Sequence, residues 1–186
     1  PHKDDEPLWQ SGTVFGTGLS GVHTLRHAIY KTDEGQVKRL GGSVVEQTMP
    51  SGISAFLSGK LGLGNWVSSN SSACSTGTES IIMAAQHIKN GGAEIMLAGG
   101  CDSGGPHSWG GFDAMRVLNS KSNTQPMKAS RPMSASASGF VPGSGGGALV
   151  LESLASAERR GAKIYAELLG GHCNSGGQRG NGSMTA

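Results

Sequence analysis

Apolar and polar positions alternate along this chain in segments that predict helices separated by short apolar strands. The clearest helix covers residues 75–90, and Gly91-Gly92 ends it. Its apolar stripe follows the i, i+3, i+4, i+7 spacing of one helical face: Ile81, Ala84, Ala85 and Ile88. The apolar run at 93–100 predicts a buried strand, and a short strand is expected at 66–71. A strand, a helix and a strand so closely joined predict a βαβ unit with parallel strands.

The rest of the chain continues this alternation. Residues 31–48 and 119–136 are polar and are expected to run over the surface. The other expected elements, in chain order, are a strand at 11–18, a helix at 22–30, a helix starting at Pro50-Ser51 and stopping at Gly62, a helix at 110–118, and a strand, a helix and a strand within 145–171. The class is therefore α/β.

Composition and charge argue against binding to nucleic acid, to a membrane or to a metal ion. The net charge of +2 over 186 residues gives no field that favours nucleic acid or a membrane surface. No apolar run is long enough to cross a bilayer. The three cysteines form no CxxC pair, and with the histidines they form no metal-binding set, so we expect no metal and no cofactor. Free thiols suit a reducing cytoplasm.

Cys74 is the candidate nucleophile. It stands in the small-residue stretch NSSACSTGTES (70–80), directly before the best predicted helix. Unpaired N–H groups and the helix dipole stabilise an anion at such a place, which favours the thiolate that a nucleophile needs. Small neighbours leave room for a substrate, and the Cys74 N–H is a candidate oxyanion donor. The alternative is that Cys74 is a small buried packing residue, the usual fate of a free cysteine.

A series of motifs resembles the β-ketoacyl-[acyl-carrier-protein] synthases. In chain order they are ACSTGTESI, KNGGAEIMLAGG, GGFDAMRVL, KASRPM, SGFVPGSGGGALVLE and RRGAKIYAELLG, and the resemblance runs from GTGLSG (16–21) to SMTA (183–186). It implies a thiolase-like fold, with αβαβα layers and a mixed sheet, that is incomplete in this sequence. Residues 1–142 would form most of the N-terminal half and residues 143–186 the start of the C-terminal half.

The resemblance also implies a function. Cys74 would take an acyl group from an acyl carrier protein as a thioester, for condensation with a malonyl-type extender in fatty acid or polyketide synthesis. Leu19 and Phe112 match positions that line the acyl pocket, although ordinary core packing also explains both. Members of the family are dimers that pair through the strand before the cysteine, here 66–70, so a homodimer or heterodimer is expected.

Several residues depart from the family pattern. Ser183 stands where a histidine is expected before Met-Thr, and Ser144 stands where an acid is expected. Serines also replace two acids, at Ser134 and Ser138. Ser183 and Ser144 favour a second hypothesis, a non-elongating partner subunit resembling a chain-length factor, whereas the retained Cys74 favours the enzyme.

Other candidate groups have plain alternatives. His107 and His172 are candidates to replace the missing imidazole, but solvated loop histidines are commoner. The glycines of GTGLSG and GSGGGA suit turns better than phosphate loops. Arg131 and residues 158–160 could contact a carrier protein, but most such charges are simply solvated.

Overall fold

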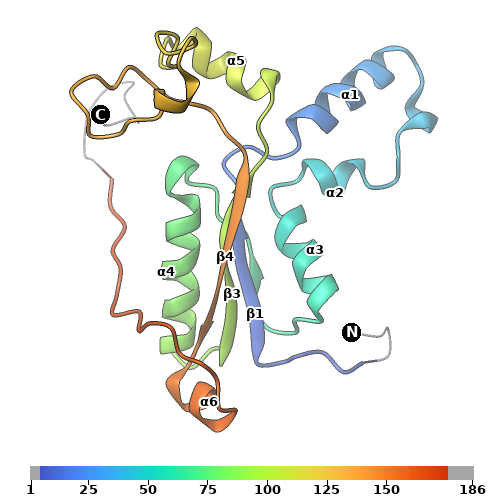
Figure 1. The fold of residues 1–186 in the computed structure, drawn as a ribbon. Coiled ribbons are helices and arrows are strands. Elements are labelled where there is room, and N and C mark those ends of the chain that lie inside the picture. Colours follow the sequence, from blue (N-terminus) through green and yellow to red (C-terminus); the bar gives the residue numbers. More distant parts are fainter. Residues whose placement is uncertain (1–4, 176–186) are drawn as a thin grey trace.

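The structure, a computed structural model, describes residues 5–175, in which four strands alternate with six α-helices and three 3₁₀ turns (Figure 1). The strands are β1 (Ser11–Gly16), β2 (Val67–Ser68), β3 (Ile95–Asp102) and β4 (Gly145–Glu152). The helices are α1 (Val22–Asp33), α2 (Val44–Thr48), α3 (Gly52–Leu61), α4 (Thr76–Lys89), α5 (Pro106–Ala114) and α6 (Leu154–Arg159). The 3₁₀ turns are η1 (Val37–Arg39), η2 (Ala73–Ser75) and η3 (Pro126–Lys128).

The strands form one mixed sheet in the order β2-β1-β3-β4. β1 pairs in parallel with β2 and β3, while β4 runs antiparallel to β3 over the full eight residues, from Ile95↔Glu152 to Asp102↔Gly145. The predicted α/β class and mixed sheet are confirmed. The predicted βαβ unit exists as β2-α4-β3, but β1 lies between its two parallel strands. The division of the chain at residue 142 stays a prediction.

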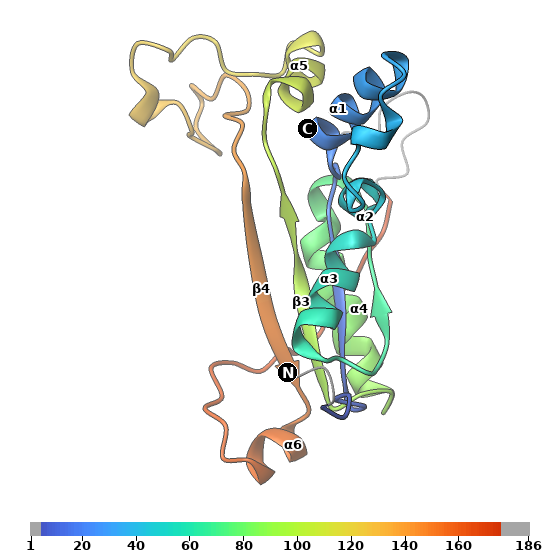
Figure 2. The same ribbon diagram turned by 90° about the vertical axis from the view of Figure 1, so that its right-hand side faces the viewer.

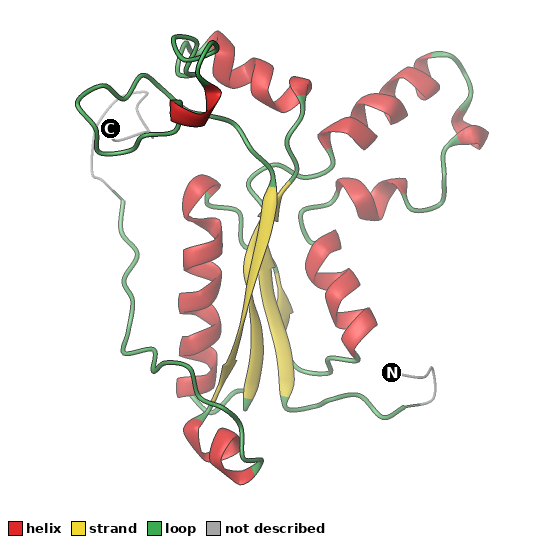
Figure 3. Ribbon diagram, viewed as in Figure 1, coloured by secondary structure: helices red, strands yellow, loops and turns green. Residues whose placement is uncertain are grey.

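Helices cover both faces of the sheet (Figures 1 and 3). α4 packs on β3 and β1, and α3 packs on the opposite face, on β1 and β2. The buried cluster under α4 consists mainly of small residues, which lets the helix lie close to the sheet: Val14, Ala84, Ala93, Met96 and Ala98. This packing fixes the direction in which α4 points.

The ends of the sheet differ (Figure 2). β1 and β3 end where α1 and α5 lie and where β4 begins. α6 lies at the opposite end of the strands. Because α4 runs antiparallel to β3, its first turn lies at the same edge as the carboxyl ends of β1 and β3. That end of the sheet therefore brings together Cys74 in η2, Asp102 at the end of β3 and Gly145 at the start of β4.

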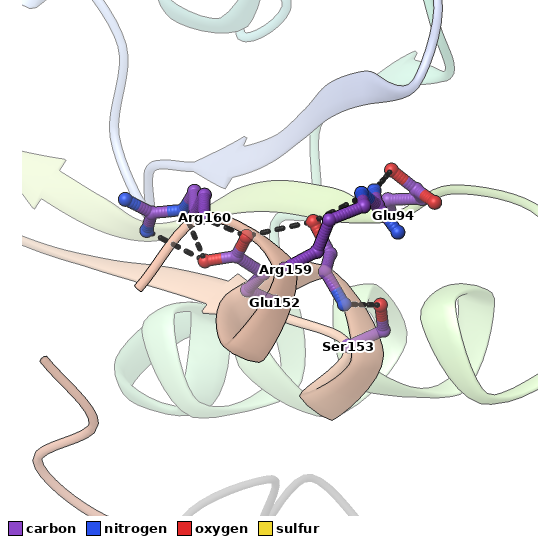
Figure 4. Close-up of polar contacts among 6 residues, drawn as sticks. Glu94, Glu152, Ser153, Arg159 and Arg160 are labelled. Atoms are coloured by element: carbon purple, nitrogen blue, oxygen red, sulfur yellow. Dashed lines mark hydrogen bonds and ion pairs between the residues drawn. The ribbon is translucent and has the colours of Figure 1, made fainter. Parts of the chain in front are cut away.

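Ion pairs tie α6 to the opposite edge (Figure 4). The Arg160 guanidinium donates to both Glu152 oxygens at 2.6–3.0 Å, and the Ser156 hydroxyl donates to Oε1 at 2.8 Å. Arg159 bonds Glu94 at 2.6 Å. The hydrogen bonds from Arg160 hold the pKa of the Glu152 carboxyl below its ordinary value, although burial acts against them. Both arginines of the segment 158–160 are thus paired with acidic side chains of this chain.

Two predicted elements differ from the structure, and the segment 31–48, which lies at the surface as expected, contains helices that were not predicted. α5 begins at Pro106 rather than near residue 110, with proline at its first position, where a missing N–H costs least. The polar segment 31–48 contains η1 and α2. Residues 163–169 form no strand, because no ladder partner lies beside them among the described residues. Within the same residues, no helix has both the length and the apolar character needed to span a membrane.

Candidate active site

A cavity of about 230 Å³ opens at the edge of the sheet where β1 and β3 end. Backbone forms much of its wall, because six of its lining residues are glycines: Gly16, Gly77, Gly100, Gly145, Gly146 and Gly147. The side chains that line it belong to Ala73, Cys74, Thr76, Cys101 and Asp102. A cavity with so few bulky side chains leaves its cysteines accessible to a small or extended group.

Cys74 lies in η2, immediately before α4, and its side chain is exposed. Ser75, the N-cap of α4, makes no side-chain capping hydrogen bond, and of the first-turn N–H groups that of Thr76 donates to the Ala73 carbonyl. A helix N-terminus carries partial positive charge, and Cys74 lies two residues before Thr76, the first residue of α4. The sulfur therefore lies at a helix entrance and in a cavity, as the sequence predicted, and outside the packed core. Its catalytic role stays a prediction.

The loop before α4 is held in an unusual backbone conformation. Ala73 has φ of +51°, which L-residues adopt at a cost of about 1 kcal/mol or more. The Thr76 hydroxyl stabilises it, because it donates to the Ala73 carbonyl at 2.7 Å and accepts from the Ser72 N–H at 2.9 Å. Asn70 completes the network with bonds of 3.0 Å to the Ser72 hydroxyl and to Glu79. The direction of Cys74 is thus fixed by side chains on both sides of it.

Glycine at position 16 is required by this network. A Cβ on Gly16 would collide with the Asn70 carbonyl oxygen and with the methyl group of Thr76. The end of β1 can therefore approach the loop before α4 only if residue 16 has no side chain.

Cys101 and Asp102 line the cavity, and the sequence reasoning did not single them out. Burial, and secondarily the neighbouring Asp102 charge, raises the pKa of the Cys101 thiol. Cys101 is therefore a poorer nucleophile near neutral pH than an ordinary thiol. The available signal was their position: they directly follow the apolar run of β3, and the carboxyl ends of parallel strands meet at one edge.

The two predicted pocket residues lie outside the wall of this cavity. Leu19 follows β1 and is 46% exposed, although its backbone N–H is bonded to the cavity residue Asp102 at 3.2 Å. Phe112 is half-buried on α5, with its ring edge-on to Phe140 at 6.2 Å between centroids. Their role in an acyl pocket stays a prediction.

The candidate replacements for an imidazole lie apart from one another. His107 is exposed in the first turn of α5, with its ring 6.5 Å from that of His23. His172 is exposed in the extended segment after α6. Ser144 is exposed next to the cavity residue Gly145, and Ser183 lies outside the described residues. Among residues 5–175, no three His, Cys, Asp or Glu side chains are grouped closely enough to hold a metal ion.

Sequence comparisons agree on one family. The model of the β-ketoacyl synthase N-terminal domain matches residues 3–157. A chloroplastic 3-oxoacyl-[acyl-carrier-protein] synthase I of Arabidopsis thaliana is 39% identical over 166 residues, which cover 89% of this chain and 35% of that protein. The 3-oxoacyl-[acyl-carrier-protein] synthase 2 of Vibrio harveyi is 36% identical, over 89% of this chain and 40% of its own length. The chain thus spans between a third and two fifths of these relatives.

Solved structures show the same fold. A β-ketoacyl synthase from Burkholderia phymatum superposes with a TM-score of 0.87 at 28% identity, over 96% of this chain and 44% of that one. A polyketide ketosynthase bound to its acyl carrier protein and a hexaketide, AntDE:AntF, gives 0.78 at 28% identity, over 84% of this chain and 40% of that one. The ishigamide ketosynthase/chain length factor gives 0.74 at 25% identity, over 91% of this chain and 41% of that one. The predicted thiolase-like fold is confirmed.

Proposed function

This chain belongs to the β-ketoacyl synthase family, and from that membership we propose that its polypeptide accepts an acyl group from an acyl carrier protein onto Cys74. The Cys74 sulfur attacks the carbonyl carbon of the carrier's phosphopantetheine thioester. A C–S bond forms at Cys74 and the carrier's C–S bond breaks. The proton of the Cys74 thiol ends on the leaving pantetheine sulfur, so the exchange is balanced without a redox partner.

The observation that carries this proposal is the placement of Cys74. Its side chain is exposed at the entrance of α4, which has no side-chain cap, and it lines a cavity of about 230 Å³ whose wall is mostly glycine backbone. A linear thioester can approach such a sulfur without displacing bulky side chains. The Cys74 N–H is the proposed donor to the oxyanion that develops when the sulfur adds to the carbonyl.

Carbon–carbon bond formation is the second half of the proposed reaction. Decarboxylation of a malonyl-type extender releases carbon dioxide and leaves an enolate. The enolate carbon attacks the Cys74 thioester carbonyl, and the Cys74 sulfur leaves as a thiolate. The relatives named 3-oxoacyl-[acyl-carrier-protein] synthases and the ketosynthase bound to a hexaketide support a place in fatty acid or polyketide synthesis.

A non-elongating partner subunit is the second candidate. Ser144 favours it, because it stands beside the cavity where the family resemblance expects an acid, and a ketosynthase/chain length factor is among the similar solved structures. Carbon dioxide release from a malonyl carrier protein separates the two candidates. The native polypeptide, assayed alone, should release it if it elongates and should not if it only shapes a partner's site.

The proposed partners follow from the same family. An acyl carrier protein supplies the acyl group, and a second ketosynthase-type subunit pairs through β2. β2 forms one edge of the sheet within residues 5–175, so its outer side is open to such pairing. The proposed compartment is the cytoplasm, which the three free cysteines support.

Intact-mass spectrometry tests the acyl transfer. The native polypeptide is incubated with an acyl carrier protein thioester, and the variants are Cys74→Ala and, as matched control, Cys173→Ala. Cys173 is also exposed, and it follows α6, the last helix within residues 5–175, by more than ten residues. We expect one acyl adduct on wild type and on Cys173→Ala and none on Cys74→Ala. An adduct that persists in Cys74→Ala would contradict the proposal.

A further inference from the structure

The Asp102 carboxylate, at the end of β3, binds three consecutive residues that follow β1. Its Oδ1 accepts hydrogen bonds from the Gly18 N–H at 2.8 Å, from the Leu19 N–H at 3.2 Å and from the Thr17 hydroxyl at 3.0 Å, whose single proton is shared with the Leu19 carbonyl at 3.1 Å. These residues are called the 17–19 loop below. Bonds to an ionised acceptor are stronger than neutral ones, so a single oxygen fixes the backbone of this loop.

The 17–19 loop in turn lies against the loop that carries Cys74. The Thr17 N–H donates to the Asn70 carbonyl at 3.3 Å, and Thr17 is only 3% exposed. A Cβ on Gly18 would lie 3.4 Å from Asp102 Oδ1 and 3.7 Å from the Ala73 carbonyl oxygen. The Gly18 backbone is therefore placed between Asp102 and Ala73, the residue with the strained φ directly before Cys74.

The three donors also matter for the charge in the cavity. A free carboxylate on the wall would repel an anion that forms at a neighbouring sulfur or carbonyl oxygen. Two backbone N–H groups and one hydroxyl oppose that charge on the side of the 17–19 loop. Asp102 can thus hold the loop in place while its charge repels an anion at Cys74 less than a free carboxylate would.

We propose that Asp102 is a positioning residue, which holds the 17–19 loop against the Ala73-Cys74 backbone and so sets the rate at which Cys74 accepts an acyl group. The proposal rests on the acyl transfer proposed above. In this proposal Asp102 acts on the reaction through the loop and not through a bond to the acyl group. Its loss therefore lowers the maximal rate of acylation and leaves the affinity for the carrier protein unchanged.

Hydrogen–deuterium exchange tests whether Asp102 holds the 17–19 loop, without reference to any activity. The native polypeptide is compared with Asp102→Ala, with Asp102→Asn, which retains an acceptor oxygen, and with Asp113→Ala, an exposed acid on α5, as matched control. We expect the Gly18 and Leu19 amides to exchange about tenfold faster in Asp102→Ala and close to wild type in Asp102→Asn and Asp113→Ala. Unchanged exchange rates in Asp102→Ala would refute the claim that Asp102 holds the 17–19 loop.

Acylation kinetics on the same variants test its consequence. We expect Asp102→Ala to lower the maximal acylation rate about tenfold with an unchanged KM for the acyl carrier protein, and Asp102→Asn to recover most of that rate. A raised KM with an unchanged maximal rate would overturn the proposal. An Asp102→Asn protein that has the Tm of wild type but acylates as slowly as Asp102→Ala would also overturn it. If Asp102→Ala does not fold, the decision rests on Asp102→Asn and on Thr17→Val, which removes one donor and should slow acylation severalfold.

The two sets of results separate the two proposals. An absent adduct on wild type refutes the acyl transfer, and the exchange data then still decide whether Asp102 holds the loop. An adduct on wild type that forms equally fast in Asp102→Ala refutes only the positioning role.

Discussion

The Thr76 hydroxyl joins the first turn of α4 to the loop that carries Cys74, and Thr76→Val tests whether that link sets the reactivity of the sulfur. Valine has nearly the same shape as threonine but neither donates nor accepts a hydrogen bond. The residue is 3% exposed, so water cannot replace what is lost. The substitution removes the bond of 2.7 Å to the Ala73 carbonyl and the bond of 2.9 Å from the Ser72 N–H.

The magnitude follows from those two bonds. The Ala73 carbonyl keeps a second donor, the Thr76 N–H, whereas the Ser72 N–H loses the partner that Thr76 provides. One neutral hydrogen bond and one unsatisfied donor together amount to about 2 kcal/mol. For a chain of this size that corresponds to a fall in Tm of about 4–8 °C. Without the bonds, Ala73 can relax from its positive φ, and Cys74 turns away from the helix entrance.

The assay pairs thermal unfolding with acylation by an acyl carrier protein thioester in the native polypeptide. The matched control is Thr76→Ser, which keeps the hydroxyl and loses the methyl group that packs against Gly16. We expect Thr76→Ser to lower Tm by a few degrees yet to acylate within about threefold of wild type, while Thr76→Val loses about tenfold or more in rate. Equal rates for Thr76→Val and wild type, or equal losses in both variants, would refute the reasoning.

Three further perturbations test other parts of the account. Gly16→Ala should lower both Tm and the acylation rate, because its Cβ collides with the loop before α4, whereas Gly110→Ala, on open space in α5, should leave the rate unchanged; a fully active Gly16→Ala protein would count against the close approach. Glu152→Gln should lower Tm by about 2–4 °C at pH 7. Because folding lowers the pKa of Glu152, the stability that its charge contributes is fully present above the unfolded pKa of about 4.3 and is lost as the pH falls through the folded pKa. A difference in Tm between wild type and Glu152→Gln that persists in strong acid would contradict this prediction. Val67→Lys, on the exposed edge strand β2, should shift the native polypeptide from dimer to monomer by light scattering, while Leu154→Lys on α6 should not; a Val67→Lys dimer would exclude pairing through β2.

Local patterns were enough to predict the element that positions the nucleophile. The stripe at 75–90 predicted α4 to within one residue at each end, since a helix with one apolar face and a glycine pair after it is determined by its own sequence. The apolar run at 93–100 likewise predicted β3, which extends to Asp102. These elements place Cys74 at a helix entrance.

Long-range pairing lay beyond those patterns. Nothing local shows that β1 enters between β2 and β3, or that one oxygen of Asp102 binds residues 17–19, some 84 positions away. The helix predicted at 110–118 begins at Pro106 in the structure, and a proline at the first position of a helix is the local signal for that start. The strand expected after α6 failed for a related reason, since a strand exists only beside a neighbour.

Competitive alkylation of the three cysteines in one sample tests the central claim most directly. The native polypeptide is treated with limiting iodoacetamide near pH 7, and the rate at each sulfur is read from its peptide by mass spectrometry. If the entrance of α4 activates Cys74, Cys74 reacts several times faster than Cys173, which is also exposed, and Cys101, whose pKa is raised, reacts most slowly. A Cys74 that reacts no faster than Cys173 would contradict the claim that this helix entrance makes a nucleophile.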